Sequence, residues 1–225
     1  MAIAVKICGL STQAALAAAV RGGARFVGFV FFPPSPRCLD LDRAATLAAQ
    51  VPDTVQRVGL VVDADDATVD ALMARVPLDM LQLHGSETPA RVAAIKDRFG
   101  VPVIKSVAVA TAADLARTAG YEAVADWLLF DAHPPTGADR PGGNARAFEW
   151  ELLNGIACRR PWFLAGGLEA GNVALAVRAS GAKAVDVSSG VEDAPGRKSV
   201  AKIEAFLRTA MHLNVAAGAA AAAGR

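Results

Sequence analysis

Two residues that could carry out acid–base chemistry stand at the ends of short apolar runs. The run Val5–Cys8 ends in a thiol, and the run Trp127–Phe130 is followed directly by Asp131. A thiolate can accept a proton and a protonated carboxyl can donate one, so the two together could perform general acid–base catalysis. Each has a structural alternative. A free cysteine is often a small buried core residue, and Asp131 could cap a helix or anchor a loop.

Composition narrows the class of protein to which these residues belong. The chain has 225 residues, of which 53% are hydrophobic, and a formal net charge of +1. It can therefore bury one large core, and its charge favours neither nucleic-acid binding nor an acidic disordered tail. Cys8, Cys38 and Cys158 are odd in number and far apart, so they form no disulfide framework and no metal site. No apolar run approaches the ~20 residues of a membrane span. The sequence therefore predicts a cytoplasmic protein with no nucleic-acid or membrane partner.

The elements that must position Cys8 and Asp131 alternate regularly along the chain. The predicted strands are Val5–Cys8, Phe26–Phe31, Gln56–Val61, Met80–Leu83, Val103–Val107, Trp127–Phe130, Trp162–Ala165 and Ala184–Ser188. The predicted helices are Thr12–Arg21, Asp42–Gln50, Ala67–Arg75, Pro89–Phe99, Ala112–Ala119, Phe148–Leu153, Gly171–Ser180 and Val200–Ala210. Ser11, Asp66 and Thr111 stand where helix N-caps are expected.

Eight such strand–helix units predict the α/β class and a single (β/α)8 TIM barrel. An open doubly wound sheet is the alternative, but it needs a Gly-rich fingerprint after the first strand, where only Gly9 stands. We expect the barrel to be one catalytic domain over residues 1–213. Residues 214–225 are almost all Ala and Gly, with no large side chain for docking, so we expect a disordered tail.

In barrels of this kind the active site lies at the C-terminal ends of the strands. Gly166-Gly167 follow the seventh predicted strand. Ser188 ends the eighth predicted strand, and Ser189-Gly190 follow it. Glycine lets the backbone approach an anion closely, and Ser-Ser-Gly offers N–H and hydroxyl donors. Because phosphate sites in these barrels often use the loops after strands seven and eight, these residues predict a phosphate site. The alternative is a pair of tight turns.

Other strand ends carry less specific groups. Arg37 lies in a stiff Pro-rich loop after the second strand, and His84 ends the fourth. We interpret His84 as structural, and as the next candidate for the acid if Asp131 is not one. Lys6 shares the inward face of the first strand with Cys8, since side chains alternate along a strand. Asp186 on the eighth strand can pair with Lys6, and we interpret that pair as structural.

The loop after the sixth strand, residues 132–147, is unusually long. Long loops in compact domains are often lids or binding loops. We expect this one to close over a substrate and to exclude water from Asp131. It contains three candidate binding residues, Gly142, Gly143 and Asn144.

Taken in order, these motifs resemble the phosphoribosylanthranilate isomerase family. The matching segments are Lys6–Gly9, Ser35–Arg37, Gln82–Gly85, Phe130–Asp131, Pro141–Asn144, Phe148–Trp150, Leu164–Leu168 and Asp186–Glu192. Each segment alone is modest, but the ordered set is specific and spans Val5 to Leu207. The resemblance implies an Amadori rearrangement in tryptophan biosynthesis, in which N-(5'-phosphoribosyl)anthranilate is converted to the carboxyphenylamino derivative of ribulose 5-phosphate. It also implies that no cofactor and no metal is used, because the iminium intermediate is itself the electron sink.

The resemblance also implies roles for individual residues. Cys8 would be the general base, Asp131 the general acid, and Arg37 the residue near the anthranilate end. The other candidate substrate-binding residues are His84, Gly142, Gly143, Asn144, Gly166, Gly167, Asp186, Ser188, Ser189 and Gly190. The partner would be a small-molecule phosphosugar, and the protein a monomer or homodimer. Two positions depart from the family pattern: Ala145 stands where glycine is usual, and Ser199 where an acidic residue is usual.

Two alternatives remain at the level of sequence. The analogous isomerase of histidine biosynthesis would carry a carboxylate base where Cys8 stands, together with two phosphate sites. A non-catalytic phosphosugar-binding barrel would keep the glycine and serine turns and do no chemistry, and the presence of both Cys8 and Asp131 argues against it.

Overall fold

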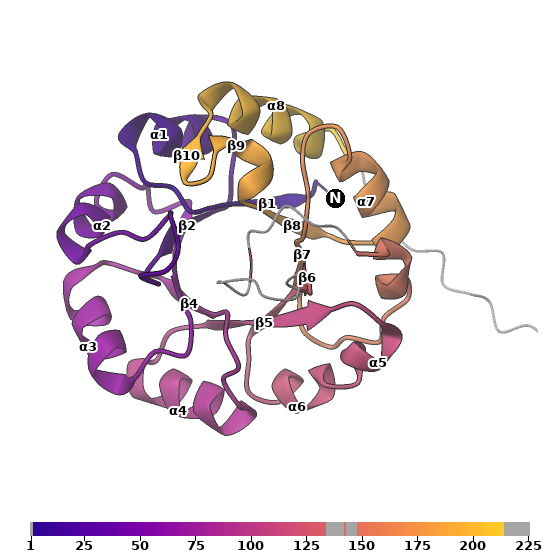
Figure 1. Cartoon of the computed structure of the whole chain (residues 1–225), viewed down its shortest axis with the longest axis horizontal. Helices are drawn as coiled ribbons and strands as arrows, with labels where there is room; N and C mark the ends of the chain where they lie inside the picture. The colour runs from indigo at the N-terminus through magenta and orange to yellow at the C-terminus, as the bar shows by residue number, and fades with distance from the viewer. Residues whose placement is uncertain (1, 134–141, 143–147, 214–225) are drawn as a thin grey trace, which may run out of the picture.

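The computed structural model describes residues 2–133, 142 and 148–213. Eight parallel strands close into a barrel in sequence order, with the helices around the outside (Figure 1). The strands are β1 (Ala4–Cys8), β2 (Phe26–Val30), β3 (Gln56–Val61), β4 (Met80–Leu83), β5 (Val103–Val109), β6 (Trp127–Ala132), β7 (Trp162–Leu164) and β8 (Ala184–Val187). The predicted (β/α)8 barrel is confirmed. The proposed tail, residues 214–225, lies outside the described residues.

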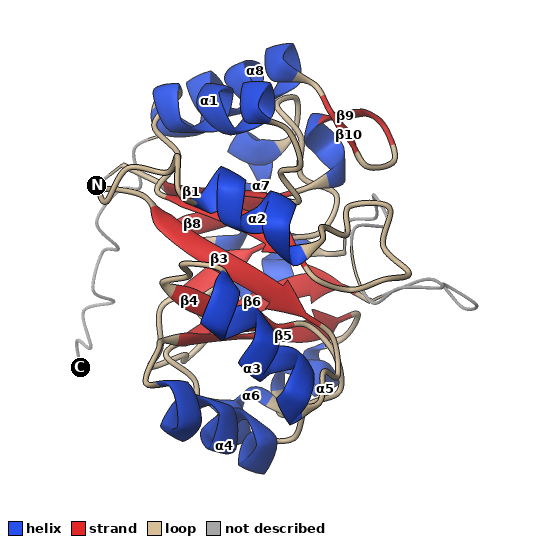
Figure 2. Cartoon of the chain, turned by 90° about the vertical axis from the view of Figure 1, so that its left-hand side faces the viewer, coloured by secondary structure: helices blue, strands red, loops and turns tan. Residues whose placement is uncertain are grey.

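The helices and the short accessory elements cover the barrel. They are α1 (Gln13–Arg21), α2 (Leu41–Ala48), α3 (Asp66–Arg75), α4 (Pro89–Phe99), α5 (Ala112–Leu115), α6 (Thr118–Glu122), η1 (Trp150–Leu153), α7 (Val173–Ser180), η2 (Ser189–Val191) and α8 (Val200–Met211). A two-stranded hairpin, β9 (Glu192–Ala194) and β10 (Arg197–Lys198), precedes α8. Figure 2 shows this hairpin at the end of the barrel opposite the N-terminus. Within the described residues, no helix is long and apolar enough to cross a membrane.

The interior of the barrel is filled with aromatic side chains at the end where the strands begin. Phe26 contacts Phe163 edge-on, with ring centroids 5.1 Å apart, and Trp127 stacks on Phe163 at 4.8 Å. Phe26 and Phe163 are buried. All five residues of β2 are buried, as expected for a parallel strand covered on both faces. This packed aromatic layer closes the N-terminal end of the barrel, beneath the polar groups at the C-terminal end.

A buried ion pair lies between this aromatic layer and the C-terminal ends of the strands, where β8 pairs with β1. Lys6 on β1 is in register with Asp186 on β8, and its Nζ lies 2.9 Å from Asp186 Oδ1. The predicted Lys6–Asp186 pair is therefore confirmed. Gly28 on β2 makes room for it, because a Cβ at that position would lie 3.0 Å from Cys8 Sγ and 3.3 Å from Lys6 Nζ.

Two local predictions were wrong, and two short elements were missed. The helix predicted over Ala112–Ala119 is split into α5 and α6, since Ala116 and Arg117 donate to carbonyls three residues back instead of four. The helix predicted over Phe148–Leu153 is the 3-10 turn η1, which is followed by Gly155 at φ 72°. The hairpin β9–β10 and the turn η2 were not predicted.

The N-cap predictions were partly right. Thr111 caps α5 through a capping box with Asp114. The other two caps lie one residue away from the prediction. Thr12 accepts from Ala15 N–H at the start of α1, and Asp65 accepts from Thr68 N–H at the start of α3.

Candidate active site

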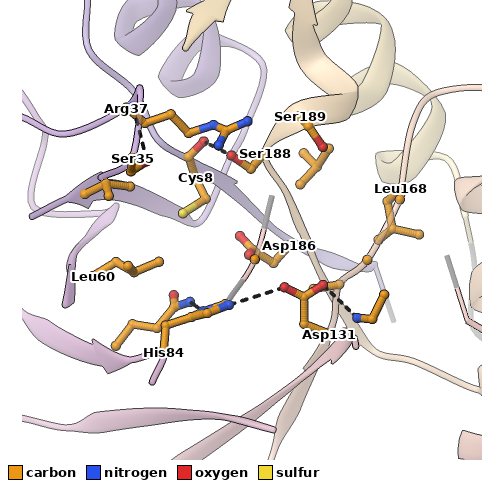
Figure 3. A pocket seen from close by; sticks show the side chains of 18 of the residues that line it. Cys8, Ser35, Arg37, Leu60, His84, Asp131, Leu168, Asp186, Ser188 and Ser189 are labelled. Carbon is orange, nitrogen blue, oxygen red and sulfur yellow. Dashed lines mark hydrogen bonds and ion pairs between the residues drawn. The ribbon is translucent and has the colours of Figure 1, made fainter. Parts of the chain in front are cut away.

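A pocket opens at the C-terminal ends of the barrel strands and brings most of the predicted residues together (Figure 3). The predicted residues that line it are Cys8, Arg37, His84, Asp131, Gly142, Gly166, Gly167, Asp186, Ser188 and Ser189. Gly190 is not part of the lining. Gly143 and Asn144, and most of the long loop to which they belong, lie outside the described residues.

Cys8 ends β1 on the inward face and is 4% exposed. Burial raises the pKa of its thiol, and the ammonium groups of Lys6 and Lys198 oppose that shift. The helix N-termini around this rim favour a thiolate. Burial has the larger effect on the pKa of Cys8, and it raises this pKa because low-dielectric surroundings favour the neutral thiol. Burial thus works against the thiolate that a general base needs, and Lys6 and Lys198 work in its favour.

Arg37 is held by a carboxylate from the hairpin after β8. Its Nε and Nη2 donate to the two oxygens of Glu192 at 2.7 and 2.8 Å, a bidentate pair. Lys198 donates to the same carboxylate at 2.7 Å and to the Ser188 carbonyl at 2.8 Å. The pKa of Glu192 is lowered: burial alone would raise it, but the bonds from Arg37 and Lys198 outweigh burial. Arg37 and Lys198 therefore share the Glu192 carboxylate beside Ser188.

Asp131 is the next-to-last residue of β6 and faces His84 across the pocket. Its Oδ2 lies 3.3 Å from His84 Nε2, and its Oδ1 accepts from Ala132 N–H at 2.8 Å. The other ring nitrogen of His84, Nδ1, lies 2.8 Å from the side-chain nitrogen of Gln82. Gly142 fits closely against this pair, since a Cβ there would meet His84 Nε2 at 2.4 Å and Asp131 Oδ2 at 2.9 Å. Both oxygens of Asp131 therefore face hydrogen-bond donors or possible donors.

The turn that carries His84 is fixed from behind by a second buried ion pair. Lys105 on β5 lies 2.8 Å from Glu87 Oε2, and both side chains are 2% exposed. Lys105 Nζ also donates to the carbonyls of Leu83 and Gly85, on either side of His84, at 3.3 and 2.7 Å. The backbone around His84 is thus held in one conformation.

The two loops predicted to bind phosphate lie against each other. Gly166 and Gly167 have φ of 84° and 64°, which side chains other than glycine rarely adopt. A Cβ on Gly190 would lie 1.9 Å from the Leu168 carbonyl oxygen, so glycine is required there for the loops after β7 and β8 to meet. Ser188 Oγ donates to the Cys8 carbonyl at 3.2 Å and connects this corner to β1.

Several lining residues were missed by the sequence argument. Gln82 could have been found, because it shares the inward face of β4 with His84 two residues later. Ser35 and His133 also line the pocket, as does an apolar wall formed by Val30, Phe32, Leu60 and Val62 at the ends of β2 and β3. Nothing in the sequence pattern pointed to Glu192 and Lys198, because their role depends on contacts with Arg37 and Ser188.

Comparison with known proteins identifies the family of this chain. Residues 5–209 match the family model described as N-(5'phosphoribosyl)anthranilate (PRA) isomerase. This chain belongs to that family. An isomerase of this name from Paramagnetospirillum magneticum is 57% identical over 210 residues, which cover 93% of this chain and 98% of the relative.

Solved structures of PRA isomerases have the same fold. The enzyme from Thermotoga maritima is 34% identical, with a TM-score of 0.84 over 94% of this chain and 100% of that one. A PRA isomerase in complex with reduced 1-(o-carboxyphenylamino)-1-deoxyribulose 5-phosphate is 33% identical, with a TM-score of 0.80 and the same coverage. The barrel described above is thus the PRA isomerase barrel along almost its whole length.

Proposed function

We propose that this protein isomerises N-(5'-phosphoribosyl)anthranilate to 1-(2-carboxyphenylamino)-1-deoxyribulose 5-phosphate in tryptophan biosynthesis, with Asp131 as general acid and Cys8 as general base. The observation that carries the proposal is the placement of these two groups. They lie at the C-terminal ends of β1 and β6 and line one pocket, and Figure 3 shows them on different sides of it. Membership of the PRA isomerase family supplies the substrate and the reaction.

The first chemical step opens the ribose ring. Asp131 in its protonated form gives its proton to the ring oxygen, the C1'–O bond breaks, and the anilino nitrogen lone pair forms an iminium with C1'. The carboxylate left on Asp131 accepts from Ala132 N–H and lies 3.3 Å from His84 Nε2. Donors placed where charge develops lower the barrier to proton transfer.

The second step forms the enolamine. The Cys8 thiolate removes the proton from C2', and the C2'–H electron pair moves toward the iminium. The enolamine then tautomerises to the ketone, with a proton lost from the 2'-hydroxyl and one gained at C1'. One proton must return from Cys8 to Asp131 through solvent to reset the site. Lys6 and Lys198 stabilise the thiolate against the opposing effect of burial.

The pocket offers a place for each end of the substrate. We assign the phosphate to Gly166-Gly167 and Ser188-Ser189. The glycines have positive φ and let the backbone approach an anion closely, and the serines at the start of η2 offer hydrogen-bond donors. The apolar wall Val30, Phe32, Leu60 and Val62 suits the anthranilate ring, and Arg37 lies on the same side of the barrel. We also propose a single catalytic domain ending near residue 213 and a monomer or homodimer.

The activity is tested by following the fluorescence of freshly prepared phosphoribosylanthranilate. Purified protein should abolish that fluorescence catalytically and should leave the phosphoribosyl precursor of histidine biosynthesis unchanged. Turnover of the histidine precursor alone would favour the analogous histidine isomerase. Tight binding of a reduced product analogue with no turnover of either compound would indicate a non-catalytic phosphosugar-binding barrel.

A further inference from the structure

Gln82 is a fully buried polar side chain to which the proposed reaction assigns no role. It lies on β4 at 0% exposure and lines the pocket. Its Nε2 is 2.8 Å from His84 Nδ1. Its Oε1 is also buried and has no hydrogen-bond partner among the described residues. An amide with one bonded and one unsatisfied atom costs stability, and such groups in native proteins commonly mark a functional constraint.

The contact between Gln82 and His84 decides where the imidazole carries its proton. An amide nitrogen can only donate, so Nδ1 must accept and the single proton of a neutral ring must be on Nε2. That nitrogen is the one that faces Asp131 Oδ2 at 3.3 Å. With Ala132 N–H on the other oxygen, both oxygens of the Asp131 carboxylate then accept a hydrogen bond.

We propose that Gln82 is a positioning residue for the general acid: its amide fixes the Nε2-protonated tautomer of His84, and His84 thereby donates to Asp131. His84 is then a fixed donor that stabilises the carboxylate left after Asp131 gives up its proton. The acid role of Asp131 belongs to the proposed function, on which this inference rests. The Lys105–Glu87 pair supports the same geometry by holding the backbone on both sides of His84.

Among the residues that the structure describes, few charged groups lie near His84. Asp131 faces it from β6, and Asp186 lies between Cys8 and this pair in the view of Figure 3. Asp186 is already paired with Lys6. Lys105 and Glu87 lie behind the turn and are paired with each other. Gln82 is therefore the group that can select the tautomer through Nδ1.

Two substitutions separate this role from a structural one. Gln82→Glu keeps the shape but replaces the donor at Nδ1 with an acceptor, so the ring proton should move to Nδ1. Gln82→Met keeps the volume and removes the amide donor, so His84 Nδ1 loses its partner and the tautomer is no longer fixed. In both variants kcat should fall at least about tenfold, with KM changed less than about twofold, because the loss concerns proton transfer and not binding. Gln56→Met, at the start of β3, is the matched control and should change neither.

The tautomer is read directly by long-range nitrogen–proton NMR at neutral pH. The chain has only three histidines, so variants of His133 and His212 assign the His84 signal. The wild-type protein should show His84 protonated on Nε2, and Gln82→Glu should show a proton on Nδ1. A wild-type His84 protonated on Nδ1 or on both nitrogens would overturn the proposal.

A fall in kcat without any change in the His84 signal of Gln82→Glu would also overturn it. The tautomer measurement needs no substrate. If Asp131→Asn kept full activity, the proposed acid would therefore be wrong while the tautomer result stood on its own.

Discussion

Replacing Gly190 by alanine tests the anion site without touching a residue that lines the pocket. A Cβ at Gly190 would lie 1.9 Å from the Leu168 carbonyl oxygen, a backbone atom that cannot rotate away. Ordinary contact begins at 3.4 Å, so the loops after β7 and β8 must separate by at least 3.4 − 1.9 = 1.5 Å. Gly190 has no positive φ, so the effect of the substitution is steric.

Overpacking of this kind costs about 1–3 kcal/mol of unfolding free energy. A misplacement near 1 Å in a binding site can cost ~10²-fold. We therefore expect Gly190→Ala to raise KM at least about tenfold and to lower kcat less, since the phosphate is bound throughout the reaction. Inhibition by inorganic phosphate should weaken in parallel. The fluorescence assay gives KM and kcat, and urea denaturation gives the free energy of unfolding.

Gly171→Ala is the matched control. It lies in the segment between β7 and α7, it also lacks a positive φ, and its nearest atom would be Glu169 Oε1 at an acceptable 3.5 Å. This variant should keep the wild-type KM. A folded Gly190→Ala enzyme with normal KM and normal phosphate inhibition would refute the assignment of the anion to these two loops.

The other predictions concern the two proposed catalytic groups and the ion pair beneath them. Cys8→Ser should lower kcat at least ~10²-fold with folding intact, because an alcohol is too weak an acid to supply the base; near-normal turnover would remove Cys8 from the mechanism. Burial raises the pKa of the Cys8 thiol above its ordinary value, so the rate of alkylation of the Cys8 peptide should still be rising at a pH where a free cysteine, with a pKa of about 8.5, is already mostly ionised. A plateau below pH 8 would contradict that shift. Asp131→Asn should bind a reduced product analogue normally by calorimetry yet lose most turnover, and retention of the wild-type rate would show that the acid lies elsewhere. Lys6→Met should cost about 3–5 kcal/mol in urea denaturation because Asp186 is left buried and unpaired, whereas Lys6→Met with Asp186→Leu should recover most of that loss; equal losses in both would mean that the charges are not coupled.

The barrel and most of the residues that line the pocket could be predicted from the sequence, because both follow from patterns within single strands and at their ends. Alternation along a strand places Lys6 and Cys8 on one inward face, and the barrel rule places Asp131, His84 and Ser188 at one rim. None of these inferences needs a side-chain contact between distant segments.

What the sequence did not reveal depends on such contacts. Arg37 and Glu192 are 155 residues apart, and their bidentate pair exists only because the hairpin β9–β10 packs against the loop after β2. The sign of the Cys8 shift depends on burial, which a sequence does not measure. The split between α5 and α6 reflects a local choice between two hydrogen-bonding patterns that similar residues can adopt.

The closure of the barrel has a consequence for how the protein is made. Lys6 forms an ion pair with Asp186, and Ser188 Oγ donates a hydrogen bond to the Cys8 carbonyl; each contact joins residues 180 positions apart in the chain. At ~5–20 residues per second, a ribosome needs about 10–40 s to make the second partner after the first. During that time the first strand carries an ammonium group whose native partner has not yet been synthesised. The surroundings of the Cys8 thiol are complete only when the eighth strand has docked against the first. We therefore expect that no N-terminal piece of this chain that lacks the eighth strand is active.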